Sequence, residues 1–318
     1  MEKLALIALL TLLAIPLHAA DVSDLTYDAS GPTITITDCD KAASGELIIP
    51  ASIEGKPVTS IEEAIFQNCD GLTSITIPDS VTSIGKYAFY ENAGLTSVTI
   101  GNGVTSIGDS AFARCNSLES ITIPDSVTTI GEAIFQYCFN LTSITIPDSV
   151  TSIGKYAFSR CTSLTSITIP DGVTSVGYGA FYMCSSLTSI TFRGNAPTLD
   201  DDVFLEAPAN AKVFIYEGAS GFSPEDGKFG GFSVVVQKKP VPPKIISVVG
   251  AGGMIPMSSL IITFTSGIGS NYAIERSRDL VNWVTLLIIA GEESSTEFTD
   301  NEPINDGGGV FYRIREGQ

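Results

Sequence analysis

The sequence predicts a mainly β protein made of two parts. The first is a β-solenoid of short repeated coils with a cap at each end, and the second is a small β-sandwich. Three observations predict this fold class: the middle of the chain repeats every 23 residues, apolar residues alternate with Ser and Thr inside each repeat, and the repeats stop at a Pro-rich segment. A length of 318 residues is enough for about two domains.

The repeat is nearly invariant. Residues 72–89 return almost unchanged as residues 141–158, and five full copies occupy residues 72–186. A divergent copy with a longer turn (46–71) precedes them, and a decaying copy begins at Leu187. One phenylalanine column recurs at the same step, as Phe66, Phe89, Phe112, Phe135, Phe158 and Phe181. Such a period predicts coils that each contact only their neighbours.

Each repeat separates inward from outward residues. The side chains expected to point inward in one coil are Leu72, Ile75, Ile77, Val81, Ile84, Ala88 and Phe89. The alternating Ser74 and Thr76 are expected to point outward, and Gly85 to turn the chain. Because one coil is too thin to fold alone, stacking is obligatory, and seven coils would extend roughly 30 Å.

These residues resemble the BspA-type leucine-rich repeats of bacterial surface proteins, with their signature L-x-x-I-x-I-P…V-x-x-I-G-x-x-A-F-x-x-C. The resemblance covers roughly residues 25–236 and includes an opening hairpin and a closing cap at residues 194–222. Two departures are Gly101-Asn-Gly in place of Pro-Asp-Ser, and Asn92 in place of a cysteine. The resemblance implies a role in adhesion and recognition at cell surfaces.

The N-terminal segment predicts export. Residues 1–20 have the pattern of a secretory signal peptide, with Lys3, an apolar run at 4–15, Pro16 and a small-residue site before Asp21. The alternative, an uncleaved anchor, needs about 20 apolar residues and finds too few. No later stretch is long and apolar enough to span a bilayer, so we expect no membrane insertion after signal removal. The solenoid with its caps is assigned to residues 21–237, in a secreted, cell-surface or periplasmic protein.

The repeat pattern ends at a Pro-rich linker, residues 238–244, which is expected to be stiff. Alternating β-runs follow at 245–249, 260–265, 272–277, 283–289, 296–299 and 310–314. They resemble strands of a fibronectin-III-like sandwich, which we assign to residues 245–318. The chain stops where the last strand of such a sandwich is expected.

Composition excludes several classes of function. A net charge of −18 argues against nucleic acid as a partner, because phosphate binding needs clustered positive charge. The single histidine, His18, lies in the predicted signal peptide. The mature chain would therefore have no imidazole for a Ser-His-Asp or Cys-His mechanism or for zinc. We predict no catalytic residue and no cofactor.

Five cysteines share one position of the repeat: Cys69, Cys115, Cys138, Cys161 and Cys184. Stacked side chains about 4.8 Å apart exceed the Cβ separation of about 3.8 Å that a disulfide prefers. Buried free thiols are therefore favoured over disulfides, which an exported protein allows, and over a metal site. Asn92 in the same position supports a role in packing or in bonding to the turn backbone. Cys39 lies outside this column and could pair with a neighbour or simply be buried.

Acidic residues suggest two further alternatives. Asp200–Asp202, and Asp38 with Asp40, could hold calcium, but neither matches a known ligand spacing, so we predict no metal site. A carboxylate pair for glycoside hydrolysis could come from the column Asp79, Asp125, Asp148 and Asp171. Recurrence at Pro-Asp turns favours a structural role for that column.

Two surfaces could bind a partner. The Ser/Thr face consists of Ser74, Thr76, Ser97, Thr99, Ser120, Thr122, Ser143, Thr145, Ser166 and Thr168. It lacks the aromatic and arginine anchors that dominate binding energies. The Tyr/Arg surface lies around the Ala-Phe segment and consists of Tyr87, Tyr90, Arg114, Tyr137, Tyr156, Arg160, Tyr178 and Tyr182. Exposed Tyr and Arg suit recognition, although such tyrosines could also only pack.

The sequence therefore predicts an exported, non-catalytic binding or adhesion scaffold for an extracellular protein or glycan. The first alternative is a carbohydrate-binding accessory protein of extracellular polysaccharide degradation. The second is a carboxylate-dependent hydrolase, which requires an acidic pair in a cleft outside the repeat register. No convincing pair of this kind is present.

Overall fold

The computed structural model describes residues 20–222 and 227–238, and the backbone of six strands between residues 245 and 316. The chain divides into two compact units, Met1–Gln237 and Lys238–Gln318. All of the predicted signal peptide except Ala20, and all of the predicted linker except Lys238, lie outside the described residues.

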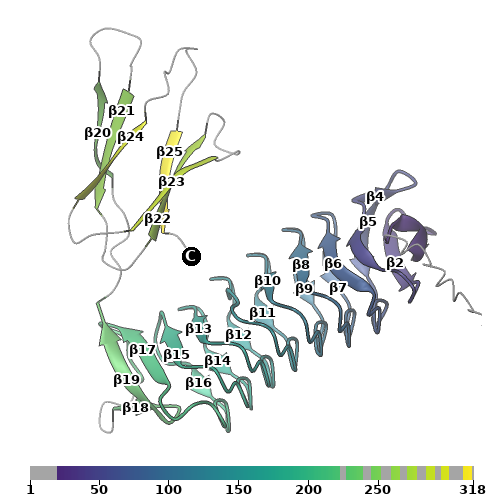
Figure 1. Ribbon diagram of the computed structural model, residues 1–318, viewed down its shortest axis with the longest axis horizontal. Helices are drawn as coiled ribbons and strands as arrows, with labels where there is room; N and C mark the ends of the chain where they lie inside the picture. Colours follow the sequence, from purple (N-terminus) through teal and green to yellow (C-terminus); the bar gives the residue numbers. More distant parts are fainter. Residues whose placement is uncertain are drawn as a thin grey trace, which may run out of the picture. The chain divides into compact units, whose positions relative to one another are not determined.

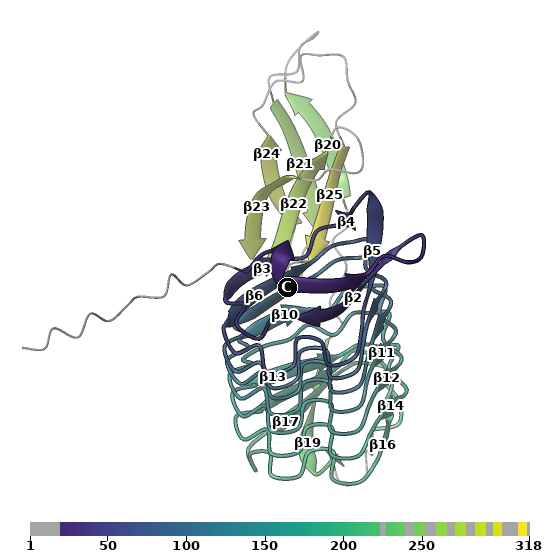
Figure 2. The same cartoon turned by 90° about the vertical axis from the view of Figure 1, so that its right-hand side faces the viewer.

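The first unit is the predicted solenoid, with about nine turns spaced by about 23 residues. Its coils lie side by side in sequence order and superimpose when viewed along the stack (Figures 1 and 2). In its described residues the helical structure is confined to a short 3₁₀ turn, Val22–Asp24. The mainly β fold class is therefore confirmed.

The first side of the coils is a parallel sheet that carries the Ser/Thr face. Its strands are β3 (Gly45–Ile48), β6 (Leu72–Ile77), β8 (Ser97–Ile100) and β10 (Ser120–Thr122), then β13 (Ser166–Ile169), β15 (Ser189–Phe192), β17 (Lys212–Tyr216) and β19 (Phe232–Gln237). Ser74 pairs with Ser97 and Ser97 with Ser120, so the pairing register equals the repeat. The coil between β10 and β13 contributes only the bridge from Thr122 to Thr145.

The second side is a narrower parallel sheet of mostly two-residue strands. They are β2 (Ile34–Cys39), β5 (Lys56–Ile61), β7 (Ser83–Ile84) and β9 (Ser106–Ile107), then β11 (Thr129–Ile130), β12 (Ser152–Ile153), β14 (Ser175–Val176) and β16 (Thr198–Leu199). From β5 to β9 and from β11 to β16 the strands pair in the same 23-residue register, for example Ser83 with Ser106. β2 pairs with β5 with a register shift.

The third side is the Ala-Phe turn, which has no strand but is still hydrogen-bonded from coil to coil. Every second backbone N–H donates to a carbonyl of the next coil: Tyr87 to Asp109 at 3.1 Å, and Phe89 to Ala111 at 2.8 Å. Two columns of this turn have left-handed backbone. They are Ala64, Tyr87, Ser110, Ala133, Tyr156, Gly179 and Asp202, and Asn68, Glu91, Arg114, Tyr137, Arg160, Met183 and Glu206. We call this side the turn ladder.

The core runs along the centre of the stack. The six predicted phenylalanines are fully buried, and their rings, together with that of Phe204, stack at centroid separations of 4.9 to 5.7 Å. Leu72, Ile75 and Ile77 are at most 1% exposed, as their alternation predicts. The inward residues of the repeat are thus confirmed, and the phenylalanine column extends one coil into the closing cap.

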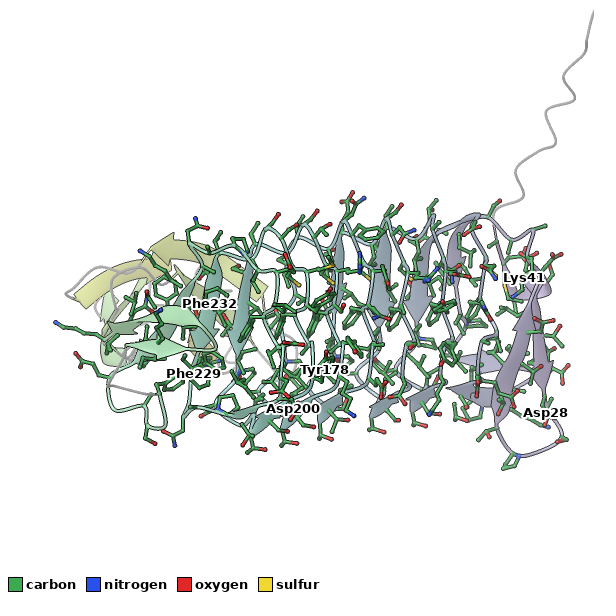
Figure 3. The ribbon with its side chains drawn as sticks, turned by 90° about the horizontal axis from the view of Figure 1, so that it is seen from below. Asp28, Lys41, Tyr178, Asp200, Phe229 and Phe232 are labelled. Carbon is green, nitrogen blue, oxygen red and sulfur yellow. The ribbon has the colours of Figure 1, made fainter. Side chains whose placement is uncertain are left out.

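Each end of the solenoid is closed by an antiparallel element. β1 (Leu25–Asp28) pairs with β2 at the opening end, and β4 (Ser52–Ile53) with β5 forms the longer turn of the divergent copy. At the closing end, β18 (Lys228–Phe229) pairs with β19. Three aromatic rings cluster there at centroid distances of 4.7 to 5.4 Å, those of Phe192, Phe222 and Phe229. Figure 3 shows this end around Phe229 and Phe232, and the opening end around Asp28 and Lys41.

The second unit consists of two three-stranded antiparallel sheets. One has the order β20 (Ile245–Ala251), β21 (Ser259–Thr265), β24 (Ser295–Asp300), and the other β23 (Val284–Ala290), β22 (Asn271–Ser277), β25 (Phe311–Glu316). All six predicted β-runs coincide with these strands within two residues. The resemblance of this unit to a fibronectin-III-like sandwich stays a prediction.

Candidate binding surface

All eight predicted Tyr/Arg residues lie on the turn ladder, on the outside of the coils. Tyr87 and Arg114 are exposed and the other six are half-buried. Because the repeat is 23 residues, Arg114, Tyr137 and Arg160 occupy one column on three successive coils. Their side chains therefore stand next to one another along the stack.

Tyr137 lies between two guanidinium groups. The guanidinium carbon of Arg114 is 5.2 Å from the centre of the Tyr137 ring, and that of Arg160 is 5.3 Å from it. Both distances fall within the range of cation–π attraction. The tyrosine ring and the two arginines therefore hold one another in place on an otherwise acidic molecule.

The same contacts continue to both sides. Arg114 lies 5.8 Å from the Tyr90 ring centre, and Arg160 lies 6.0 Å from that of Tyr182. Tyr87 packs edge-on against Tyr90 at 5.6 Å. Six of the predicted residues thus form one continuous row, which we call the aromatic–arginine strip: Tyr87, Tyr90, Arg114, Tyr137, Arg160 and Tyr182. Arg114 also pairs with Glu91 at 2.9 Å between Nη1 and Oε1.

The two remaining residues form a separate contact. Tyr156 and Tyr178 pack edge-on with ring centres 5.3 Å apart. The Tyr178 hydroxyl donates to Asp202 Oδ2 at 2.9 Å, and this bond and the Asp202 charge raise the pKa of Tyr178. The Tyr178 N–H donates to Asp200 Oδ2, and Figure 3 shows the two residues near each other. Two of the aspartates considered for calcium therefore contact this tyrosine.

The backbone under the strip is fixed by the coil geometry. Tyr137 and Arg160 have φ of 63° and 62°, and their backbone N–H groups donate to the carbonyls of Ser159 and Tyr182. The side chain varies from coil to coil, whereas the left-handed backbone recurs. Gly179 is needed for space, since a Cβ there would lie 2.9 Å from the Tyr156 ring.

Sequence reasoning missed two exposed apolar features. Phe139 is 38% exposed and packs edge-on against Tyr137 at 5.9 Å, so it widens the strip. The equivalent positions of the other repeats hold small or polar residues, so the phenylalanine at this position was the signal in the sequence that could have identified it.

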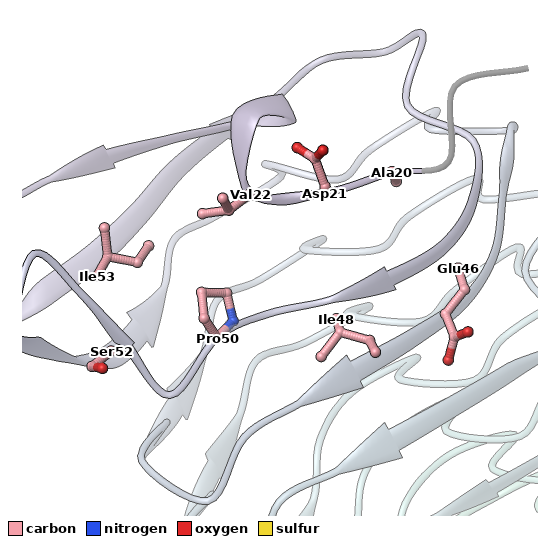
Figure 4. A pocket seen from close by; sticks show the side chains of 8 residues that line it. All are labelled: Ala20, Asp21, Val22, Glu46, Ile48, Pro50, Ser52 and Ile53. Atoms are coloured by element: carbon pink, nitrogen blue, oxygen red, sulfur yellow. The ribbon is translucent and has the colours of Figure 1, made fainter. Parts of the chain in front are cut away.

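The second feature is a pocket of 610 Å³ at the opening cap (Figure 4). Its lining includes Ile48, which is 60% exposed and pairs with Thr76, so an isoleucine stands in a Ser/Thr column.

The Ser/Thr face is a regular strand surface. Ser74 and Thr76 are half-buried, and the other eight residues of this face are exposed. The face repeats the same two side chains from coil to coil and contains no aromatic or arginine side chain among those ten positions. Its chemistry is that of a uniform hydroxyl array.

The cysteine column consists of free, buried thiols, as favoured from the sequence. Cys115, Cys138, Cys161 and Cys184 each donate Sγ–H to the carbonyl of a phenylalanine 26 residues earlier, at 3.1 to 3.2 Å. Asn92 donates to the Phe66 carbonyl at 2.7 Å, so it bonds to the turn backbone as expected. Burial raises the pKa of Cys115 and of Cys184 to about 12.

The acidic candidates take part in local structure. Asp79 accepts the Asn102 N–H at 2.7 Å, and Asp148 pairs with Arg193 at 2.8 Å. Asp38 and Asp40 each accept a backbone N–H of their own turn. In the part of the chain that the structure describes, no group of three or more His, Cys, Asp or Glu side chains is placed to hold a metal. Within the same residues, no helix has the length and apolarity to cross a bilayer.

Comparison with known proteins identifies the family of these repeats. The family described as BspA type leucine rich repeat region matches in six copies, over residues 46–138 and 129–221. A leucine rich repeat protein of T. pallidum has 24% identity and a TM-score of 0.41, over 63% of this chain and 87% of its own. A leucine rich cell surface protein of Faecalibacterium prausnitzii has 26% identity and a TM-score of 0.42, over 67% of this chain and 74% of its own. No curated protein sequence matches the chain.

Proposed function

Because the chain belongs to the BspA-type leucine-rich-repeat family, we propose that it is an exported, non-catalytic scaffold that binds an extracellular protein or glycan through the aromatic–arginine strip. Proteins of this family are typically found at the bacterial cell surface. The predicted signal peptide at residues 1–20 supports the same location. The observation that carries the proposal is Tyr137 held between Arg114 and Arg160.

The composition of the strip supports a binding role. Tyrosine and arginine are enriched among the residues that carry most of the energy at interfaces. A ring that is half-buried between two cations presents its hydroxyl in one defined orientation. Such a residue loses little conformational entropy on binding, because much of its freedom is already lost.

The rigidity of the turn ladder adds to this argument. Each strip residue sits on a turn whose backbone is hydrogen-bonded to the next coil, for example Tyr137 to Ser159 at 2.9 Å. Spacing between successive anchors is therefore fixed by the stacking of the coils. A partner with groups at a matching spacing would contact several anchors together.

The absence of catalysis is part of the proposal. The Pro-Asp aspartates that could have formed a hydrolytic pair are spread over successive coils, and two of them bind turn N–H or arginine groups. A mature chain without His18 would have no imidazole in any coil.

The test combines a binding screen with matched variants. The purified protein is screened against extracellular proteins and a glycan panel, which also separates the main proposal from the polysaccharide-accessory alternative. With the ligand in hand, Tyr87→Ala and Tyr137→Ala are each expected to weaken binding by more than about 1 kcal/mol, with an unchanged melting temperature. Tyr156→Ala, which lies outside the strip, tests whether the binding surface extends to the contact between Tyr156 and Tyr178.

The control variants lie on the Ser/Thr face. Thr99→Lys, Thr122→Lys and Thr145→Lys place long cations on that face and should leave affinity unchanged. If these variants abolish binding while the tyrosine variants bind normally, the Ser/Thr face is the binding site and the strip is not.

A further inference from the structure

The opening cap holds a pair of cysteines that differs from the cysteine column. Cys39 is the last residue of β2, and Cys69 is the first member of the column; they are 2% and 0% exposed. The Cys39 thiol donates to the Asp40 carbonyl at 3.6 Å, and the Cys39 and Cys69 thiols are close enough for each to shift the pKa of the other. By contrast, the four thiols of later coils are each directed at a phenylalanine carbonyl.

The position of Cys69 in the stack explains this difference. The later thiols donate to a phenylalanine of the preceding coil, but the position 26 residues before Cys69 is Ala43, in the opening cap. Its sulfur faces the cap, where Lys41 lies. The Lys41 ammonium donates to the Ile65 carbonyl at 2.8 Å and lies 3.7 Å from Cys69 Sγ. The segment that carries Cys39 therefore reaches the Cys69 sulfur through Lys41, which lies two residues after Cys39.

We propose that Cys39 and Cys69 are a disulfide-forming pair, oxidised by a small-molecule or protein disulfide, and that the resulting bond joins the opening hairpin to the first coil. Because both side chains are buried in the folded protein, oxidation takes place when the cap opens locally, with Lys41 still beside Cys69. Lys41 positions and activates the attacking sulfur.

The chemistry is a thiol–disulfide exchange in two steps. Cys69 Sγ, as the thiolate, attacks one sulfur of the external disulfide, forming a mixed disulfide and releasing one thiolate, which takes up a proton. Cys39, after losing its proton, attacks Cys69 Sγ and expels the second external thiolate. The pair is oxidised by two electrons, and the external disulfide is reduced to two thiols.

The electrostatics of the cap favour Cys69 as the attacking group. The interaction with the Cys39 thiol and the charge of Lys41 lower the pKa of Cys69, whereas the interaction with Cys69 and burial raise the pKa of Cys39. Burial raises the pKa of the thiols in the later coils. Since the thiolate is the reactive form, oxidation is expected at the cap pair and not along the column.

The bond would stabilise the opening end of the solenoid. Terminal repeats have a neighbour on one side only and depend on a cap. Cys39 and Cys69 are 30 residues apart, so their bond would close a loop that contains β3, β4 and β5. This cross-link restricts the unfolded chain and holds β2 against the first coil.

The test counts thiols after refolding. The full chain is denatured, reduced, refolded in a mixture of oxidised and reduced glutathione, denatured again and alkylated with N-ethylmaleimide for mass spectrometry. We expect four labelled cysteines, a linked pair of peptides containing Cys39 and Cys69, and a higher melting temperature than for the reduced protein. Six labelled cysteines, or a bond within the column, would overturn the proposal.

Three variants sharpen the result. Cys39→Ser should leave five labelled cysteines, because Cys69 then has no partner, whereas Cys138→Ser should leave three and keep the cap bond. Lys41→Met should slow bond formation at neutral pH. An unchanged rate with the bond still formed would overturn the role of Lys41, and bond loss in Cys138→Ser would overturn the assignment of the pair. The wild-type thiol count decides the proposal even if Cys39→Ser does not fold.

Discussion

The inner and outer columns of the turn ladder share one short segment but obey different constraints. Phe135 and Cys138 face inward, are fully buried and recur with little change, whereas Tyr137, between them, faces outward in a column that also holds Glu91, Arg114 and Met183. Inside the solenoid, each side chain must pack against the equivalent side chains of the two neighbouring coils. Outside, only the backbone is constrained, so the side chain is available for recognition. The comparison indicates where this fold keeps its structure and where it can carry function.

The largest expected effect comes from breaking an inner column. Phe135→Ala removes a fully buried ring that stacks on Phe112 and Phe158 at 5.7 and 5.5 Å. We expect the free energy of unfolding to fall by about 3–5 kcal/mol. Chemical denaturation measures this change, and Tyr137→Ala is the outer control. Superimposable unfolding curves for wild type and Phe135→Ala would show that the inner column does not set stability.

The inner thiols should also make stability depend on alkaline pH. Burial raises the pKa of Cys115 and Cys184 to about 12 in the folded state, against about 8.5 for an unfolded thiol. The stability that the two thiols contribute is fully present at pH values below the unfolded-state pKa. As the pH rises from there toward the folded-state pKa, the free energy of unfolding falls by about 1.4 kcal/mol per thiol per pH unit.

Denaturation at pH values from neutral to alkaline checks this slope. The double variant Cys115→Ser/Cys184→Ser keeps hydrogen-bond donors at both positions but does not titrate in this range. Its free energy of unfolding should fall less steeply with pH than that of wild type. Equal slopes would mean that these two thiols do not carry the effect.

A third prediction concerns the coil in which the cysteine column holds an asparagine. Asn92 is fully buried, and its Oδ1 atom has no hydrogen-bond partner among the described residues. Asn92→Cys keeps a donor to the Phe66 carbonyl and removes that oxygen, so we expect a gain of about 1–3 kcal/mol, the cost of an unsatisfied buried group. The reciprocal variant Cys138→Asn should lose stability. A destabilised Asn92→Cys protein would show that the asparagine is the better fit in its coil.

The smallest effect concerns the outer columns, where backbone rather than side chain is constrained. Ser110 has φ of 56°, a conformation that glycine adopts without strain. Ser110→Gly is therefore expected to raise the free energy of unfolding by about 1 kcal/mol. Ser120→Gly, at an ordinary strand position of β10, should lower it by roughly 0.5–1 kcal/mol. The same sign for both variants would contradict a left-handed requirement in the outer columns.

Periodicity predicted most of the solenoid. The alternation of Leu72, Ile75 and Ile77 identified the buried strand positions, and the fixed step of the phenylalanines identified the stack, because both depend on a repeat visible in the sequence. The same step places Arg114, Tyr137 and Arg160 in contact, so the core of the strip was available from spacing alone.

Other features depend on contacts that no period describes. The left-handed columns have no residue signature, since Tyr, Ser, Ala and Asp all occupy them. The contact between Cys69 and Lys41 arises where the repeat meets the irregular opening cap, and the cluster of Phe192, Phe222 and Phe229 arises where it meets the closing cap. Sequence reasoning is therefore strongest inside the repeats and weakest at their junctions.

The stacking of the coils has a consequence for evolution. Because successive coils pair in one register and bury the same residue types, a duplication or deletion of 23 codons would join two surfaces that already fit. The gene can thus lengthen or shorten in whole units while both caps stay unchanged. Each such event would add or remove one step of the outer columns, so the length of the contact surface could vary between strains without a new fold having to arise.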